Sequence, residues 1–128
     1  MNFRSLHGME FPSEMEDLDL SGNALKSVPS QLSKFQNLRS INLSQNPIQS
    51  LGEFTFDGDS EKYENLENVT LEDCDQLGYV DDAAFAYLKN LKSVSFKNSA
   101  LFYLRNGLIN VFTTLRYVVE FHIMKTLF

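Results

Sequence analysis

The sequence predicts an α/β solenoid, with short parallel strands on one face and irregular or short helical segments on the other. Three observations support this fold class. A nine-residue frame occurs four times, the apolar residues within it are spaced as in a strand, and Pro or Gly interrupts any longer helical stretch. Self-similarity at this spacing indicates stacked coils rather than a single globular core.

The four copies of the frame begin at Met15, Leu38, Leu66 and Leu91, so their spacings are 23, 28 and 25 residues. Positions one, four and six of each copy are apolar. Because positions four and six are two residues apart, they point to the same side of a strand. The residues predicted to face inward are therefore Leu18, Leu20, Ile41, Leu43, Val69, Leu71, Val94 and Phe96. One strand cannot bury its apolar side alone, so neighbouring coils must stack.

The segments between the strands carry further apolar residues that complete the predicted core. Pro29 and Pro47 exclude a long amphipathic helix there. The spacing of 28 residues contains an insertion, from Gly52 to Tyr63, which we expect to bulge from the back or edge of the solenoid. The predicted core residues of these segments are Leu25, Val28, Leu32, Phe35, Ile48, Leu51, Phe54, Phe56, Tyr63, Leu77, Val80, Phe85, Leu88, Leu101, Leu104, Leu108, Ile109 and Phe112.

The frame resembles the L-x-x-L-x-L-x-x-N/C repeat of the leucine-rich-repeat family, and the resemblance covers about residues 15–118. It implies a segment of a horseshoe with strands on the concave face. It also implies that position nine, held by Asn23, Asn46, Cys74 and Ser99, bonds to the backbone of the adjacent coil. Asn offers both donors and an acceptor, whereas Cys and Ser offer fewer groups. This ladder should therefore be weaker in the second half of the chain.

The two ends depart from the repeat. We expect an irregular segment over residues 1–14, the array over 15–118 with the start of a fifth repeat, and an atypical apolar tail over 119–128, where Glu120 and Ile123 break the frame. Solenoids normally carry polar caps. We therefore expect a truncated or alternative product of a longer repeat protein, and the uncapped ends leave self-association open.

Composition and short motifs bear on the compartment. The net charge of -6 argues against nucleic-acid binding and against binding to an anionic membrane surface. No signal peptide or membrane-spanning segment is present in this sequence. The segment from Val80 to Leu91 resembles the return segments of extracellular leucine-rich repeats, and Asn42 and Asn68 begin N-glycosylation sequons. The resemblance implies an extracellular protein or ectodomain, and a cytoplasmic location stays open.

The outward strand residues form the candidate site, a mixed polar strip suited to a protein ligand. An equally open interpretation is that Asp17 pairs with Arg39, and Glu72 with Lys97, without any ligand. The predicted function is non-catalytic protein recognition, with structural spacer repeats or an intracellular scaffold as alternatives. The candidate residues are Asp17, Asp19, Arg39, Ser40, Asn42, Asn68, Thr70, Glu72, Ser93, Ser95 and Lys97.

The residues offer little support for catalysis or metal binding. His7 and His122 lie in the irregular ends without a nucleophile beside them, and the single cysteine, Cys74, fits a buried ladder position. Residues 57–61 lack the alternating ligands and closing Glu of a calcium loop. We therefore expect no catalytic, cofactor-binding or metal-binding residues.

Overall fold

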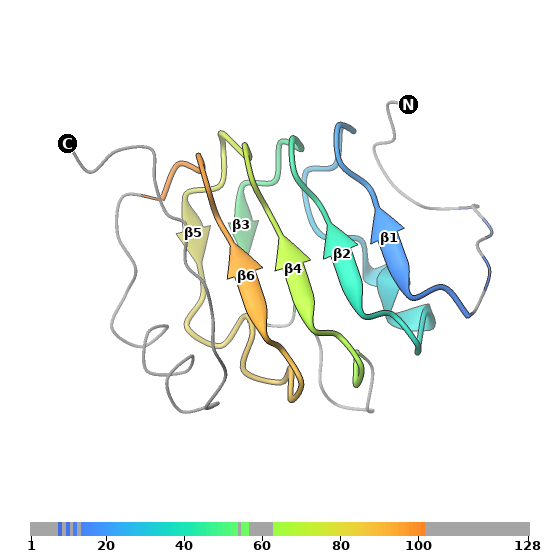
Figure 1. Cartoon of the computed structure of the whole chain (residues 1–128). Coiled ribbons are helices and arrows are strands. Elements are labelled where there is room, and N and C mark those ends of the chain that lie inside the picture. Colours follow the sequence, from blue (N-terminus) through green and yellow to red (C-terminus); the bar gives the residue numbers. More distant parts are fainter. Residues whose placement is uncertain are drawn as a thin grey trace.

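A parallel sheet of four short strands forms one face of the molecule (Figure 1). The computed structural model describes residues 8, 10, 12, 14–53, 55, 56 and 63–101. Within them, the strands lie side by side in the order β1 (Asp17–Asp19), β2 (Ser40–Asn42), β4 (Asn68–Thr70) and β6 (Ser93–Ser95). Each strand comes from one copy of the nine-residue frame, and the copies stack in register, which confirms the predicted fold class.

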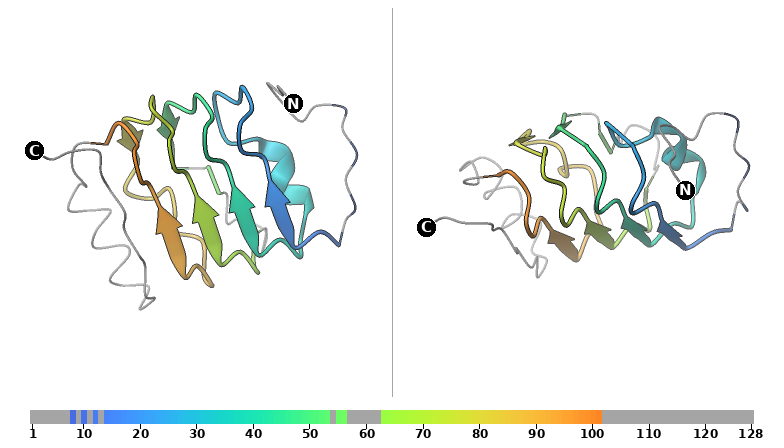
Figure 2. Two further views of the ribbon diagram at one scale, coloured as in Figure 1. Left: turned by 45° about the horizontal axis from the view of Figure 1, so that its top comes forward. Right: turned by 90° about the horizontal axis from the view of Figure 1, so that it is seen from above.

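The return segments form a second layer behind this sheet (Figure 2, right). They include the 3-10 helix η1 (Ser30–Lys34) and a small parallel sheet of β3 (Ser50–Leu51) and β5 (Tyr79–Val80). The short helical segment agrees with the prediction. The β3–β5 pairing was not predicted, because two residues are too few to show a strand period.

The core lies between the two layers and is continuous through the coils. All eight side chains predicted to face inward from the frame are buried, with exposed fractions from 0% to 6%. Burying large aliphatic and aromatic side chains is the main driving force for stacking, at roughly 1.5–3 kcal/mol each before entropy is subtracted.

Four buried rings, Phe56, Tyr63, Phe85 and Phe96, form what we call the aromatic spine. Ring centroids are 5.4 Å apart for Phe56 and Tyr63, 5.5 Å for Phe56 and Phe85, and 6.0 Å for Phe85 and Phe96. Phe56 and Tyr63 lie in the predicted insertion, so this part of the insertion is anchored in the core. Residues 54 and 57–62 lie outside the described residues. They include the predicted core residue Phe54 and the calcium-like segment of residues 57–61.

At position nine, Asn46 and Cys74 form the expected ladder between coils. The buried Asn46 amide donates to Leu20 O, Leu43 O and Ser44 O at 2.9, 3.0 and 3.2 Å, and its Oδ1 accepts from Leu25 N at 3.1 Å. In the later coils, Cys74 Sγ donates to Leu43 O at 3.5 Å and Ser99 Oγ accepts from Leu101 N at 3.3 Å. The predicted weakening of the ladder along the chain is confirmed.

The residue before each ladder position turns the chain out of its strand. Gly22, Gln45, Asp73 and Asn98 occupy position eight, with φ of 70°, 58°, 56° and 59°. This left-handed conformation is easiest for Gly and tolerated by small polar residues. The predicted fifth repeat, the tail over 119–128, His7 and His122 lie outside the described residues.

Candidate functional site

The outward side chains of the four-stranded sheet form two columns across the concave face. The register aligns Asp17, Ser40, Asn68 and Ser93 in one column, and Asp19, Asn42, Thr70 and Ser95 in the other. Each strand presents these residues because its central apolar residue points into the core. The structure thus brings eight of the eleven predicted site residues onto one surface.

A hollow of about 470 Å³ lies on this face, over β1, β2 and β4 and reaching β6. Apart from the sheet residues Leu18 and Ile41, its lining is polar. The predicted site residues that line it are Asp17, Asp19, Ser40, Asn42, Asn68, Thr70 and Ser93. It can therefore accept a polar group of a ligand, which the sequence alone did not indicate.

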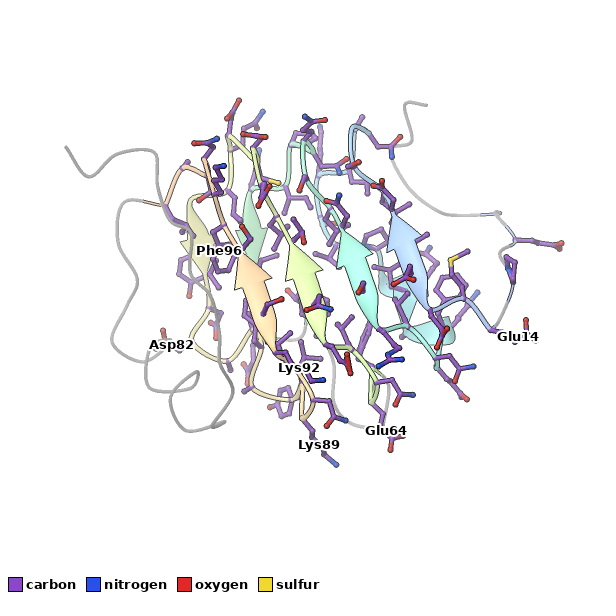
Figure 3. All side chains as sticks on the ribbon, in the orientation of Figure 1. Glu14, Glu64, Asp82, Lys89, Lys92 and Phe96 are labelled. Atoms are coloured by element: carbon purple, nitrogen blue, oxygen red, sulfur yellow. The ribbon has the colours of Figure 1, made fainter. Side chains whose placement is uncertain are left out.

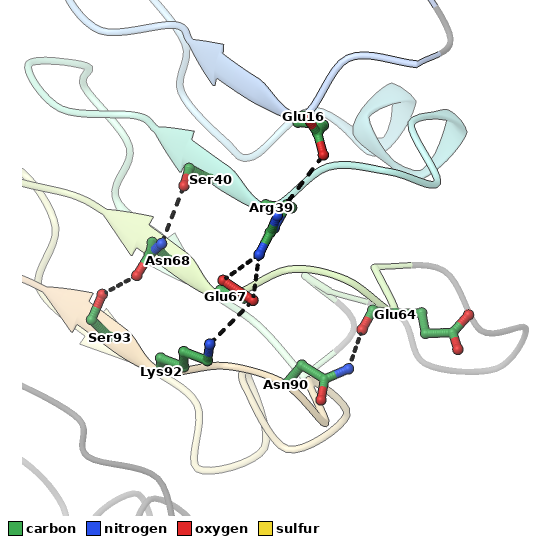
Figure 4. A network of polar contacts seen from close by, with 9 residues as sticks. All are labelled: Glu16, Arg39, Ser40, Glu64, Glu67, Asn68, Asn90, Lys92 and Ser93. Atoms are coloured by element: carbon green, nitrogen blue, oxygen red, sulfur yellow. Dashed lines mark hydrogen bonds and ion pairs between the residues drawn. The ribbon is translucent and has the colours of Figure 1, made fainter.

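A chain of side-chain hydrogen bonds runs across the first column (Figure 4). Ser93 Oγ donates to Asn68 Oδ1 at 2.6 Å, and Asn68 Nδ2 donates to Ser40 Oγ at 3.2 Å. Both bonds join neighbouring strands, so these polar groups stabilise the stacking as well as facing solvent. Their hydrogen-bonding capacity is partly used within the protein.

An ion-pair network lies at the edge of the sheet where the strands begin (Figure 4). Glu67 contacts Arg39 Nη2 and Lys92 Nζ, both at 3.3 Å, and Arg39 also lies 4.0 Å from Glu16. Arg39 and then Lys92, as hydrogen-bond donors, hold the pKa of the Glu67 carboxyl below its ordinary value. The expected pairing of Arg39 with Asp17 is wrong, because the guanidinium reaches the edge residues instead.

The expected pairing of Glu72 with Lys97 is also wrong. Glu72 Oε1 accepts a hydrogen bond from Ser95 Oγ at 2.8 Å, and the structure contains no ion pair between Glu72 and Lys97. Arg39, Glu72 and Lys97 thus flank the hollow rather than line it. Neither expected pair forms, because Arg39 contacts the carboxylate of Glu67 and Glu72 accepts from the hydroxyl of Ser95.

Sequence reasoning missed an asparagine contact between coils at the same edge. Asn65 Nδ2 donates to Gln36 O at 3.0 Å, and Asn90 Nδ2 donates to Glu64 O at 2.6 Å. The signal was in the sequence, because an asparagine directly precedes the first residue of three copies of the frame, at Asn37, Asn65 and Asn90.

Among the described residues, Asp19 and Cys74 are the other two groups whose pKa is shifted. Ser21 donates to Asp19 Oδ1 through its hydroxyl at 2.6 Å and its backbone N–H at 2.9 Å, and these bonds lower the pKa of Asp19. Burial raises the pKa of the Cys74 thiol, which is fully enclosed. Cys74 is therefore a buried ladder residue, as predicted, and not a reactive thiol.

Figure 3 shows polar and charged side chains over much of the described surface, with Glu14, Glu64 and Lys89 projecting outward. Within the described part of the chain, no three His, Cys, Asp or Glu side chains come together as a metal site would require. Nor does this part contain a helix with the length and apolarity to cross a membrane.

Comparison with known proteins agrees with the repeat and the fold. Residues 13–56 match the family model described as leucine-rich repeats in two copies. No curated protein matches the chain. Among solved structures, a chain of the Toll–Spatzle complex of Drosophila is similar, with a TM-score of 0.66 and 22% identity over 80% of this chain. The match spans 14% of the length of that chain. The repeat frame, the parallel sheet, the position-nine ladder and these matches together identify the fold as a leucine-rich-repeat solenoid, with the family model itself matching residues 13–56.

Proposed function

We propose that this chain is a non-catalytic protein-recognition module that contacts its ligand with the concave sheet. The observation that carries the proposal is the division of each strand between two environments. The inward residue of every strand is buried, whereas the two columns beside it are polar and lie on one accessible surface. The core does not depend on the residues of such a surface, so their identity can differ from one ligand to another.

The polar character of the surface sets the expected affinity. Aromatic and arginine side chains dominate most binding hot spots. The two columns contain no aromatic residue, and the nearby Arg39 is already paired with Glu67. The exposed tyrosines of the described part, Tyr79 and Tyr87, come from the return segments instead. A modest affinity that depends on hydrogen bonds follows from this composition.

The similar solved structure supports a role in protein binding in general. It is a structure of the complex of Toll with Spatzle, so it comes from a protein that binds another protein. At 22% identity the likeness concerns the fold. The ligand of this chain is therefore proposed from its own surface.

A second candidate function is a structural spacer with no ligand of its own. The internal contacts favour it, because Asn68 bonds to both Ser40 and Ser93, and Glu67 forms ion pairs with Arg39 and Lys92. Polar groups that already have partners within the protein gain less free energy from hydrogen bonds to a ligand.

A capture experiment with matched variants separates the two functions. The variant Asn42→Arg/Thr70→Arg fills the hollow, whereas Gln49→Arg/Ser50→Arg adds the same charge to exposed positions of the return layer. A recognition module loses its partner in the first variant and keeps it in the second. Failure of the wild type to capture any partner would support the spacer function, and equal capture by both variants and the wild type would show that the partner binds outside the concave sheet.

We also propose an extracellular parent protein, on the basis of the sequons at Asn42 and Asn68. Both asparagines lie on the concave face and line the hollow. A glycan on either would cover the proposed contact surface, so glycosylation and ligand binding compete there. Expression through a secretory pathway, followed by a glycosidase-sensitive mass measurement on Asn42→Gln and Asn68→Gln, identifies the modified site. An unchanged mass would count against extracellular parentage.

A further inference from the structure

Hydrogen-bonding capacity is spread unevenly across the concave face. Toward β6, the side chains are engaged with one another: Ser93 with Asn68, Ser95 with Glu72, and Asn98 Nδ2 with Asp73 Oδ1 at 2.9 Å. At the β1 end the situation is different. Among the described residues, no hydrogen bond or ion pair engages the Asp17 carboxylate there, or the Thr70 hydroxyl two strands away on β4.

These groups line the same hollow. Asp17, Asp19, Asn42 and Thr70 come from three adjacent strands around it. Asp17 and Asp19 are two residues apart on β1, about 6.6 Å, and the neighbouring strand lies about 4.8 Å away. One side-chain group of a ligand can therefore reach both carboxylates.

The charge at this end of the hollow is negative. Ser21 fixes the Asp19 carboxylate through two donors to a single oxygen, which leaves the other oxygen available. Arg39, which directly precedes β2, contacts Glu67 and Glu16 at the edge of the sheet. Lys97 lies just beyond β6, at the opposite end of the sheet.

We infer that the β1 end of the hollow binds an arginine side chain of a protein ligand, held by Asp17 and Asp19 with Asn42 and Thr70 beside it. This inference rests on the proposed recognition function. A guanidinium group fits because it is planar and carries five donors that can serve two carboxylates at once. A lysine ammonium group has the charge without this spread, so it binds less well.

Nuclear magnetic resonance titration of the full chain tests the inference with two defined peptides. The probe is acetyl-Gly-Arg-Gly-Arg-Gly-amide, and its control replaces both arginines with citrulline, which has nearly the same shape without the charge. The arginine peptide should shift the backbone amide signals of Asp17, Asp19, Asn42 and Thr70. The citrulline peptide should not.

Charge-matched variants exclude a general attraction to an acidic protein. Asp17→Asn/Asp19→Asn should raise the Kd for the arginine peptide about three- to tenfold, as expected for two partly exposed ion pairs. Glu53→Gln/Glu64→Gln removes the same charge from exposed positions outside the hollow and should leave the Kd unchanged.

The outcomes distinguish this inference from the proposed function. An equal loss of affinity in both double variants overturns the arginine site. Shifts on the concave strands that Asp17→Asn/Asp19→Asn does not weaken also overturn it, while leaving the concave face as the contact surface. Shifts confined to the return layer contradict both proposals.

Discussion

The Asn46 side chain joins two consecutive coils of the solenoid, and its replacement by alanine is the most direct test of the ladder. The side chain is 3% exposed and makes four hydrogen bonds to backbone groups. Asn46→Ala removes all four bonds and adds no bulk. The resulting loss of stability therefore measures the lost hydrogen bonds to the backbone and not steric strain.

The bonds lost are not equivalent. Leu25 N–H loses the acceptor that Asn46 Oδ1 provides, and an unsatisfied buried donor costs about 1–3 kcal/mol. Leu20 O keeps Asn23 Nδ2 as a donor at 2.9 Å, and Leu43 O keeps the Cys74 thiol, so the loss at each carbonyl is smaller. The sum is a destabilisation of about 2–4 kcal/mol.

Cys74→Ala at the equivalent position of a later coil is the matched control. It removes one long bond to a carbonyl that Asn46 still serves, together with a small buried sulfur, and should cost about 1 kcal/mol. Urea unfolding followed by circular dichroism measures both free energies. Hydrogen exchange at the Leu25 amide should accelerate only in Asn46→Ala. If Asn46→Ala costs no more than Cys74→Ala, the ladder does not stabilise the stack as argued.

Three further predictions use the same unfolding assay. Phe85→Ala removes the middle ring of the aromatic spine and should cost about 3–5 kcal/mol; a loss below about 1 kcal/mol would mean that the core is not continuous there. Gly22→Ala should cost about 1–2 kcal/mol through its φ of 70° alone, because the added Cβ would meet only Gln45 Oε1, at 3.6 Å; no loss would show that the turn relaxes. The free energy of unfolding should decrease as the pH is lowered below about 4.5, because Glu67 and Asp19 have folded pKa values below their ordinary values of 4.5 and 3.8. Such groups stabilise the fold above the unfolded pKa, and this stabilisation is lost as the pH falls through the folded pKa. Glu67→Gln should therefore make the decline of stability with falling pH less steep. An unchanged pH profile would contradict the ion-pair network.

The sequence alone was sufficient to predict the concave sheet. Leu18, Ile41, Val69 and Val94 occupy the same position of the frame, and the structure aligns them in one row of buried residues. It was sufficient because the strand period of two residues determines which side chains can be buried, whatever the neighbouring coil contains. The weakening of the position-nine ladder follows equally from residue type.

Only the tertiary structure decided which polar groups meet. Arg39 contacts Glu67 rather than Asp17, and Glu72 accepts from Ser95 rather than pairing with Lys97. Long exposed side chains have several partners within reach, and differences of a few tenths of a kcal/mol choose between them. The same holds for the pairing of β3 with β5, because two-residue strands have no readable period and form only when stacked coils bring their backbones together. Burial is therefore set locally by side-chain spacing, whereas the candidate site depends on contacts between coils that are 23 to 28 residues apart in sequence.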